Sequence, residues 1–117
     1  MRERCRGGLL GGAGCLLAVL LLSCVPSSVL RNGLPVPYEQ AAEDDLRRGK
    51  RALEQGRYDQ AIAAFEPFLA ELAGSRRADE ALWLLAGAHR QQGDMERSAL
   101  TLRRLIDRFP RSPYAPR

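Results

Sequence analysis

Residues 56–65 of this 117-residue chain match residues 93–102 in the placement of their small and apolar side chains. Each segment begins with glycine and ends with a bulky apolar residue, Phe65 in the first and Leu102 in the second. The offset between the segments, from 56 to 93, is 37 residues. A unit of this length cannot bury a core by itself, and such a period is typical of helical solenoids, in which each unit packs against the next.

Apolar residues recur at helical spacing in four segments, which predicts an all-α domain of four antiparallel helices in two hairpins. Glycines follow the first and third segments and Pro110 follows the last, as expected at helix ends. Ser75 and Asp94 are candidate N-caps. No segment shows a strand pattern. The expected helices are residues 39–55, 58–72, 78–92 and 95–109.

Pro67 falls inside the second predicted helix. Proline removes one backbone donor and crowds the preceding turn, at a cost of about 3 kcal/mol in a helix interior. We therefore expect a kink at this position, or an early end of the helix followed by a restart.

The repeated pattern resembles the tetratricopeptide repeat, a two-helix unit with small residues where its helices meet. The second unit supplies Leu82, Leu85, Ala86, Gly93, Ser98, Leu102, Leu105 and Pro110, and the first supplies Gly49, Ala52, Gly56, Tyr58, Ala61 and Phe65. The first unit departs from the pattern because it lacks the closing proline and has polar Asp45 and Arg48 at usually apolar positions, which indicates a terminal, capping repeat. The resemblance implies a scaffold that binds other proteins.

The first 24 residues resemble a bacterial lipoprotein signal. Three arginines precede an apolar stretch, residues 9–22, that is shorter than the ~20 residues needed to span a bilayer. The stretch leads into Leu-Leu-Ser-Cys at 21–24, the order of residue types in a lipobox. The resemblance implies that residues 1–23 are cleaved and that Cys24 is acylated. An ordinary cleaved signal, with Cys24 there by chance, is the alternative.

Residues 24–38 contain prolines, serines and an Asn-Gly pair, which predicts a flexible tether between the lipid and a helical domain at 39–117. Fully extended, residues 25–38 would reach roughly 45 Å. Val25 follows the cysteine in place of the Asp that retains enterobacterial lipoproteins at the inner membrane. The expected location is therefore the periplasmic face of the outer membrane, with the inner membrane as the alternative.

The last predicted helix leads into Phe-Pro-Arg-Ser-Pro-Tyr-Ala at 109–115, which resembles the joint between repeats of Gram-negative envelope lipoproteins. Similar proteins are the lipoprotein of the outer-membrane barrel-assembly machinery, the Tol-Pal cell-division coordinator and the N-terminal part of penicillin-binding-protein activators. The resemblance implies a lipid-anchored scaffold in outer-membrane or cell-wall assembly. Because such a joint normally leads into another helix, the N-terminal fragment of a larger activator is the alternative.

Few residues from 24 onward could carry chemistry. His89 is the only histidine, expected to pack in the core, and Cys24 would be the only cysteine left after cleavage. We therefore expect no metal site, no catalytic triad, no cofactor and no enzyme activity. The leader holds three arginines and one glutamate, so its loss lowers the formal charge from +4 to +2, which gives no support to nucleic-acid binding.

Trp83 lies on the first helix of its repeat unit, the helix that faces the concave side of such a solenoid. With Leu46, Lys50, Glu80 and Arg90 it forms a candidate groove for envelope proteins or peptides. Trp and Arg are favoured anchors of protein interfaces, which supports this interpretation. The alternative for Trp83 is packing against the neighbouring helix pair.

Overall fold

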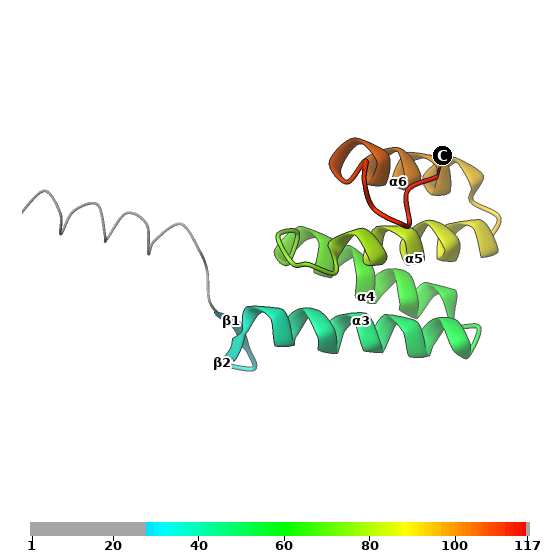
Figure 1. Cartoon of the computed structure of the whole chain (residues 1–117). Coiled ribbons are helices and arrows are strands. Elements are labelled where there is room, and N and C mark those ends of the chain that lie inside the picture. Colours follow the sequence, from blue (N-terminus) through cyan, green and yellow to red (C-terminus); the bar gives the residue numbers. More distant parts are fainter. Residues whose placement is uncertain (1–27, 117) are drawn as a thin grey trace, which may run out of the picture.

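The computed structural model describes residues 28–116, a short β-hairpin followed by four helices (Figure 1). The hairpin strands are β1 (Ser28–Arg31) and β2 (Leu34–Pro37). The helices are α3 (Tyr38–Glu54), α4 (Tyr58–Glu71), α5 (Ala78–Gln91) and α6 (Met95–Arg108). The four predicted helices are confirmed, and no predicted helix end is more than one residue from the observed one.

The helices lie side by side, and each runs antiparallel to the one before it (Figure 1). Helix α4 packs against both α3 and α5, and α5 also packs against α6. The contact between α3 and α5 is slight. This order is that of two stacked helical hairpins, as the repeat predicts. The largest fully buried side chains are Phe65, Phe68, Leu46, Leu72, Leu82, Leu85 and Leu105.

Gly49 and Phe65 set the spacing between α3 and α4. The Phe65 ring is fully buried, and a Cβ atom on Gly49 would overlap it. Glycine therefore lets the two helices approach closely, which is the role that the repeat pattern assigns to this position.

The helix ends follow four of the five sequence signals, since α6 ends at Arg108, just before Pro110, and only the signal at Ser75 fails. Gly56 and Gly93 have φ angles of 71° and 88°, a conformation that glycine adopts without strain. The side chain of Asp94 accepts a hydrogen bond from the backbone N–H of Arg97 at 3.0 Å, which confirms it as an N-cap. The predicted cap at Ser75 is wrong: α5 begins at Ala78, and Ser75 Oγ instead accepts the N–H of Arg77 within the preceding turn.

Helix α4 continues through Pro67, so the early end expected there does not occur. Pro67 is exposed, and so is Ala63, whose carbonyl loses its helical partner to the proline. Phe65 and Phe68 on the opposite face are fully buried. Burial of these two rings holds the helix together, while water can reach the turn that lacks a hydrogen bond.

The prediction of a strandless, flexible tether is wrong for residues 28–37, which form the hairpin. The strands pair in antiparallel register, with Val29 opposite Val36, and both valines pack against the core. Asn32 and Gly33 between the strands have φ angles of 53° and 81°, the signs that a type I′ turn requires. The Asn-Gly pair does not break the structure here, because it forms the turn that joins the two strands. The predicted leader, Cys24 and the first residues of the predicted tether all fall within residues 1–27, which lie outside the described residues.

Arg31 fastens the hairpin to both helices of the first repeat. Its guanidinium donates hydrogen bonds to Asp45 on α3 at 2.8 Å and to Glu71 at the end of α4 at 2.7 Å. Asp45 is 5% exposed and also accepts a hydrogen bond from Arg48. Asp45, a polar residue that departs from the repeat pattern in the first unit, therefore serves to attach the hairpin.

Candidate functional site

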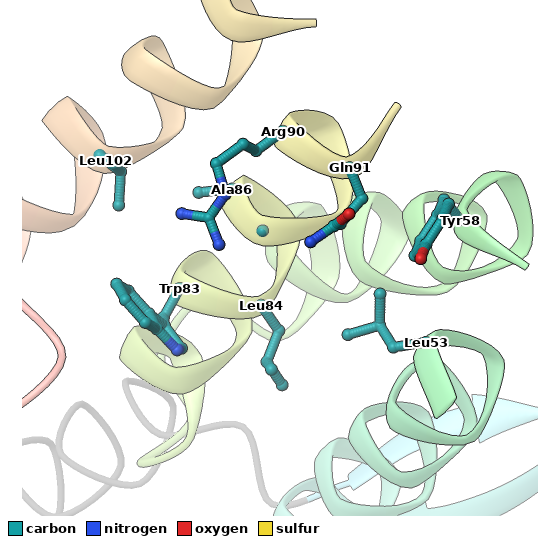
Figure 2. A pocket seen from close by; sticks show the side chains of 9 residues that line it. Leu53, Tyr58, Trp83, Leu84, Ala86, Arg90, Gln91 and Leu102 are labelled. Carbon is teal, nitrogen blue, oxygen red and sulfur yellow. The ribbon is translucent and has the colours of Figure 1, made fainter. Parts of the chain in front are cut away.

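An open pocket of about 260 Å³ lies over the exposed side of α5 (Figure 2). Helix α5 supplies most of its lining, and single residues from the other three helices form its borders. The lining residues are Leu53, Tyr58, Trp83, Leu84, Ala86, Gly87, Arg90, Gln91 and Leu102. The pocket thus spans both repeats, because Leu53 and Tyr58 belong to the first and the remaining residues to the second.

Three positions on α5 explain why a pocket forms here. Trp83, Gly87 and Arg90 are spaced at i, i+4 and i+7, which puts them on one face of the helix. No atom lies within 4 Å of the place where a Cβ on Gly87 would be. The side chains of Trp83 and Arg90 therefore lie on either side of Gly87, where the space above the backbone is empty.

Trp83 both packs and stays accessible. It is 39% exposed, and its ring centroid lies 6.5 Å from that of Tyr114. Tyr114 belongs to the segment after α6, which folds back toward α5 (Figure 1). The Ser112 hydroxyl donates a hydrogen bond to Asp79 Oδ2 at 2.7 Å and so fixes this segment to the start of α5. Trp83 therefore packs against the C-terminal segment and leaves part of its ring open to the pocket.

Arg90 supplies the positive charge of the pocket. Its side chain extends back along α5 toward Trp83 (Figure 2). Among residues 28–116, Arg90 makes no ion pair with a carboxylate. Its guanidinium is therefore available for a carboxylate from outside the chain, beside apolar side chains that would reduce screening by water.

Lys50 and Glu80 lie elsewhere, between the first helices of the two repeats. Lys50 Nζ is 2.5 Å from Glu80 Oε1, and Arg77 Nε donates to Glu80 Oε2 at 3.0 Å. Burial by itself would raise the pKa of Glu80, but the hydrogen bonds and charges of Lys50 and Arg77 outweigh it and lower the pKa. This cluster ties α3 to α5.

Leu46 does not line the pocket, because it is 1% exposed and belongs to the core. Of the five residues predicted for a groove, the structure therefore brings only Trp83 and Arg90 together at the pocket. Leu53, Tyr58, Leu84 and Leu102 also line the pocket and were not predicted as groove residues. Leu53 and Tyr58 flank the turn at Gly56, a signal that could have placed them at one end of the helices.

His89 is buried at 3% exposure, as predicted for a packing position. Its Nδ1 has no hydrogen-bond partner among the described residues. In the same part of the chain, no group of three or more His, Cys, Asp or Glu residues is placed to hold a metal ion. Helices within residues 28–116 are all too short or too polar to cross a membrane.

The family model for the tetratricopeptide repeat matches residues 46–113, from the third turn of α3 to the segment after α6. Searches of curated proteins and of solved structures gave no significant match. The matched range includes the C-terminal half of α3, all of α4, α5 and α6, the small residues between the helices and every residue that lines the pocket. The chain therefore belongs to the tetratricopeptide repeat family.

Proposed function

We propose that this protein is a lipid-anchored scaffold of the bacterial envelope, held at the periplasmic face of the outer membrane by an acylated Cys24. The observation that carries the anchor is the lipobox at residues 21–24 behind a short apolar stretch and a basic start. Tetratricopeptide repeats are a scaffold type of fold that binds other proteins, and this chain contains two such units. The proposed role is to hold an envelope protein near the membrane during outer-membrane or cell-wall assembly.

The pocket on α5 is the proposed binding surface. Its walls combine apolar side chains, a partly exposed Trp83 and the cationic Arg90. Tryptophan and arginine are frequent anchors at interfaces because each offers a large contact area together with directional polar contacts. A peptide with an apolar side chain next to a carboxylate fits this combination, since its charge would meet Arg90 while its apolar part covers Trp83.

The binding role is tested by crosslinking in living cells. A photoreactive residue is placed at Trp83, and a matched control carries it at Arg47, an exposed position on α3 whose side chain is 59% accessible. Recovery of one envelope protein from the Trp83 position and not from Arg47 is expected. Equal recovery at both positions, or none at Trp83 with the domain folded, would contradict binding at the pocket.

The lipid is tested separately by labelling cells with an acyl probe. We expect the label on the native chain and not on a Cys24→Ser variant, because only the thiol accepts the lipid. Equal labelling of both would reject acylation at Cys24. Membrane fractionation of the labelled protein then decides between the outer membrane and the inner membrane.

An alternative is the N-terminal fragment of a larger activator of cell-wall synthesis. The observation that favours it is the joint at residues 109–115, which in similar lipoproteins leads into a further helix. DNA sequence immediately after the codon for Arg117 separates the two, because an in-frame continuation would favour the fragment.

A further inference from the structure

The β-hairpin lies very close to the proposed lipid anchor. Ser28, the first residue of β1, is four positions after Cys24. Whatever the conformation of those residues, four steps of at most ~3.6 Å keep Ser28 within about 15 Å of Cys24. Because Arg31 and the two strand valines attach the hairpin to the helices, a lipid on Cys24 would hold the folded domain against the bilayer.

Apart from Ser28 and the turn residues Asn32 and Gly33, the exposed residues of the hairpin are apolar. Leu30 is 68% exposed and Leu34 is 67% exposed, more than any other large hydrophobic side chain among the described residues. Pro35 lies opposite Leu30 in the strand pairing, and Pro37 at the end of β2 is exposed as well. By the strand register Leu30 and Leu34 lie on opposite faces of the hairpin, one on each side of the tight turn. Together they make the tip of the hairpin apolar on both faces, which an apolar environment would favour.

The carboxylates next to the hairpin are each paired with an arginine, and Arg31 serves two of them. They lie in the first turns of α3, which directly follows the hairpin in the chain, and at the end of α4, which Arg31 contacts. The ion pairs are Arg31–Asp45, Arg31–Glu71, Arg76–Glu39 and Arg77–Glu43, with N···O distances from 2.6 to 3.4 Å. Paired carboxylates repel an anionic lipid surface weakly, so the apolar tip can approach it.

We propose that the hairpin is a second membrane contact, in which Leu30 and Leu34 enter the boundary between headgroups and acyl chains beside the lipid of Cys24. This inference rests on the proposed acylation, because the lipid brings the hairpin to the surface. Amphipathic segments anchored in this way bury their apolar side chains about 5–10 Å into that boundary. The contact would fix which side of the helical domain faces the periplasm.

A single anchor and a single reporter make the test direct. From residue 24 onward, Cys24 is the only cysteine and Trp83 the only tryptophan. The chain from residue 24, which contains every described element, is coupled through the Cys24 thiol to maleimide-bearing lipid in vesicles of phosphatidylethanolamine and phosphatidylglycerol. Trp83→Phe removes the native fluorescence, and Leu34→Trp in that background places the reporter on the hairpin. Flotation verifies coupling, and circular dichroism verifies folding.

Vesicles with brominated acyl chains quench tryptophans that reach the bilayer. We expect the emission of the Leu34→Trp variant to fall by about half or more, as for a side chain at the acyl boundary. The matched control is Leu100→Trp in the same background, a leucine that is 59% exposed on α6, away from the hairpin (Figure 1). It should be quenched little, and adding Leu30→Asp to the hairpin reporter should reduce its quenching.

Quenching of the hairpin reporter no stronger than that of the control would overturn the proposal. A change in reporter emission that depends on protein density and not on bromination would also overturn it, because it would assign the tip to a second copy of the chain. The maleimide anchor does not depend on acylation in cells. Failure of the hairpin contact is therefore distinguished from failure of the lipid, which acyl labelling of Cys24 decides.

Discussion

At the scale of single residues, two glycines inside helices have opposite surroundings. A Cβ on Gly49 would overlap the Phe65 ring, whereas a Cβ on Gly87 would meet no atom within 4 Å. In a helix, alanine is more favourable than glycine by about 0.5–1 kcal/mol. The local gain is therefore the same at both positions, and only the packing differs.

We predict that Gly49→Ala lowers the free energy of unfolding by about 1–3 kcal/mol, because overpacking outweighs the helix preference. Gly87→Ala should raise it by about 0.5–1 kcal/mol. Urea unfolding monitored by circular dichroism measures both. Equal changes in the two variants would contradict the close approach of α3 and α4.

Glu80 makes the stability of the domain sensitive to acid. Its pKa is lowered in the folded chain, so its ionised form stabilises the fold above the pKa of the unfolded chain, near 4.5. That stabilisation is lost as the pH falls through the lower folded pKa. Glu80→Gln should reduce the free energy of unfolding by about 1–2 kcal/mol at pH 7. Thermal unfolding between pH 3 and 7 should show the native chain and the variant converging below pH 4.5; a constant difference would contradict the ionised cluster.

At the scale of elements, the hairpin depends on one arginine for its polar contacts to the helices. Arg31→Ala would remove the bonds to Asp45 and Glu71 and leave Asp45 with Arg48 as its partner. We predict a loss of about 1–2 kcal/mol in unfolding free energy and faster hydrogen exchange in β1 and β2. Arg48→Ala is the matched control: the Arg48 side chain is 60% exposed, and its loss should cost less than about 1 kcal/mol. Similar losses of unfolding free energy in the two variants would argue against Arg31 as the residue that attaches the hairpin to the helices.

At the scale of the whole molecule, neither helix pair has a closed core. Helix α5 packs against α4 as well as α6, so each pair completes the core of the other. The salt bridge between Lys50 and Glu80 adds a direct link from α3 to α5. Repeats coupled through such neighbour contacts unfold together when the interface is large relative to the stability of each unit.

We therefore predict one cooperative unfolding transition for the described domain. Circular dichroism follows all four helices, and the fluorescence of Trp83 follows the second repeat alone. The two curves should coincide in urea. A circular-dichroism change that precedes the fluorescence change would show that α3 and α4 unfold separately.

The residue pattern by itself determined the helices of this protein. Helix formation depends on spacing, capping and breakers within a few residues, and these local signals placed each helix end to within one residue. They did not determine the outcome at Pro67, where the buried Phe65 and Phe68 keep α4 continuous. The offset of 37 residues also determined which helices pair, because small residues at equivalent positions, Gly49 with Ala86 and Ala61 with Ser98, recur where helices meet. The scaffold character follows from this repeat and not from any single residue.

Tertiary contacts decided the hairpin and the pocket. The segment at 28–37 is too short for a stable hairpin in water, and it becomes ordered because Val29, Val36 and Arg31 find partners on helices that come later in the chain. Leu46 and Trp83 are both large and apolar on first helices of their units, yet one is in the core and the other is partly open. Trp83 is covered only in part, by Tyr114 of the segment that returns after α6, and this contact depends on the assembled core and not on local spacing.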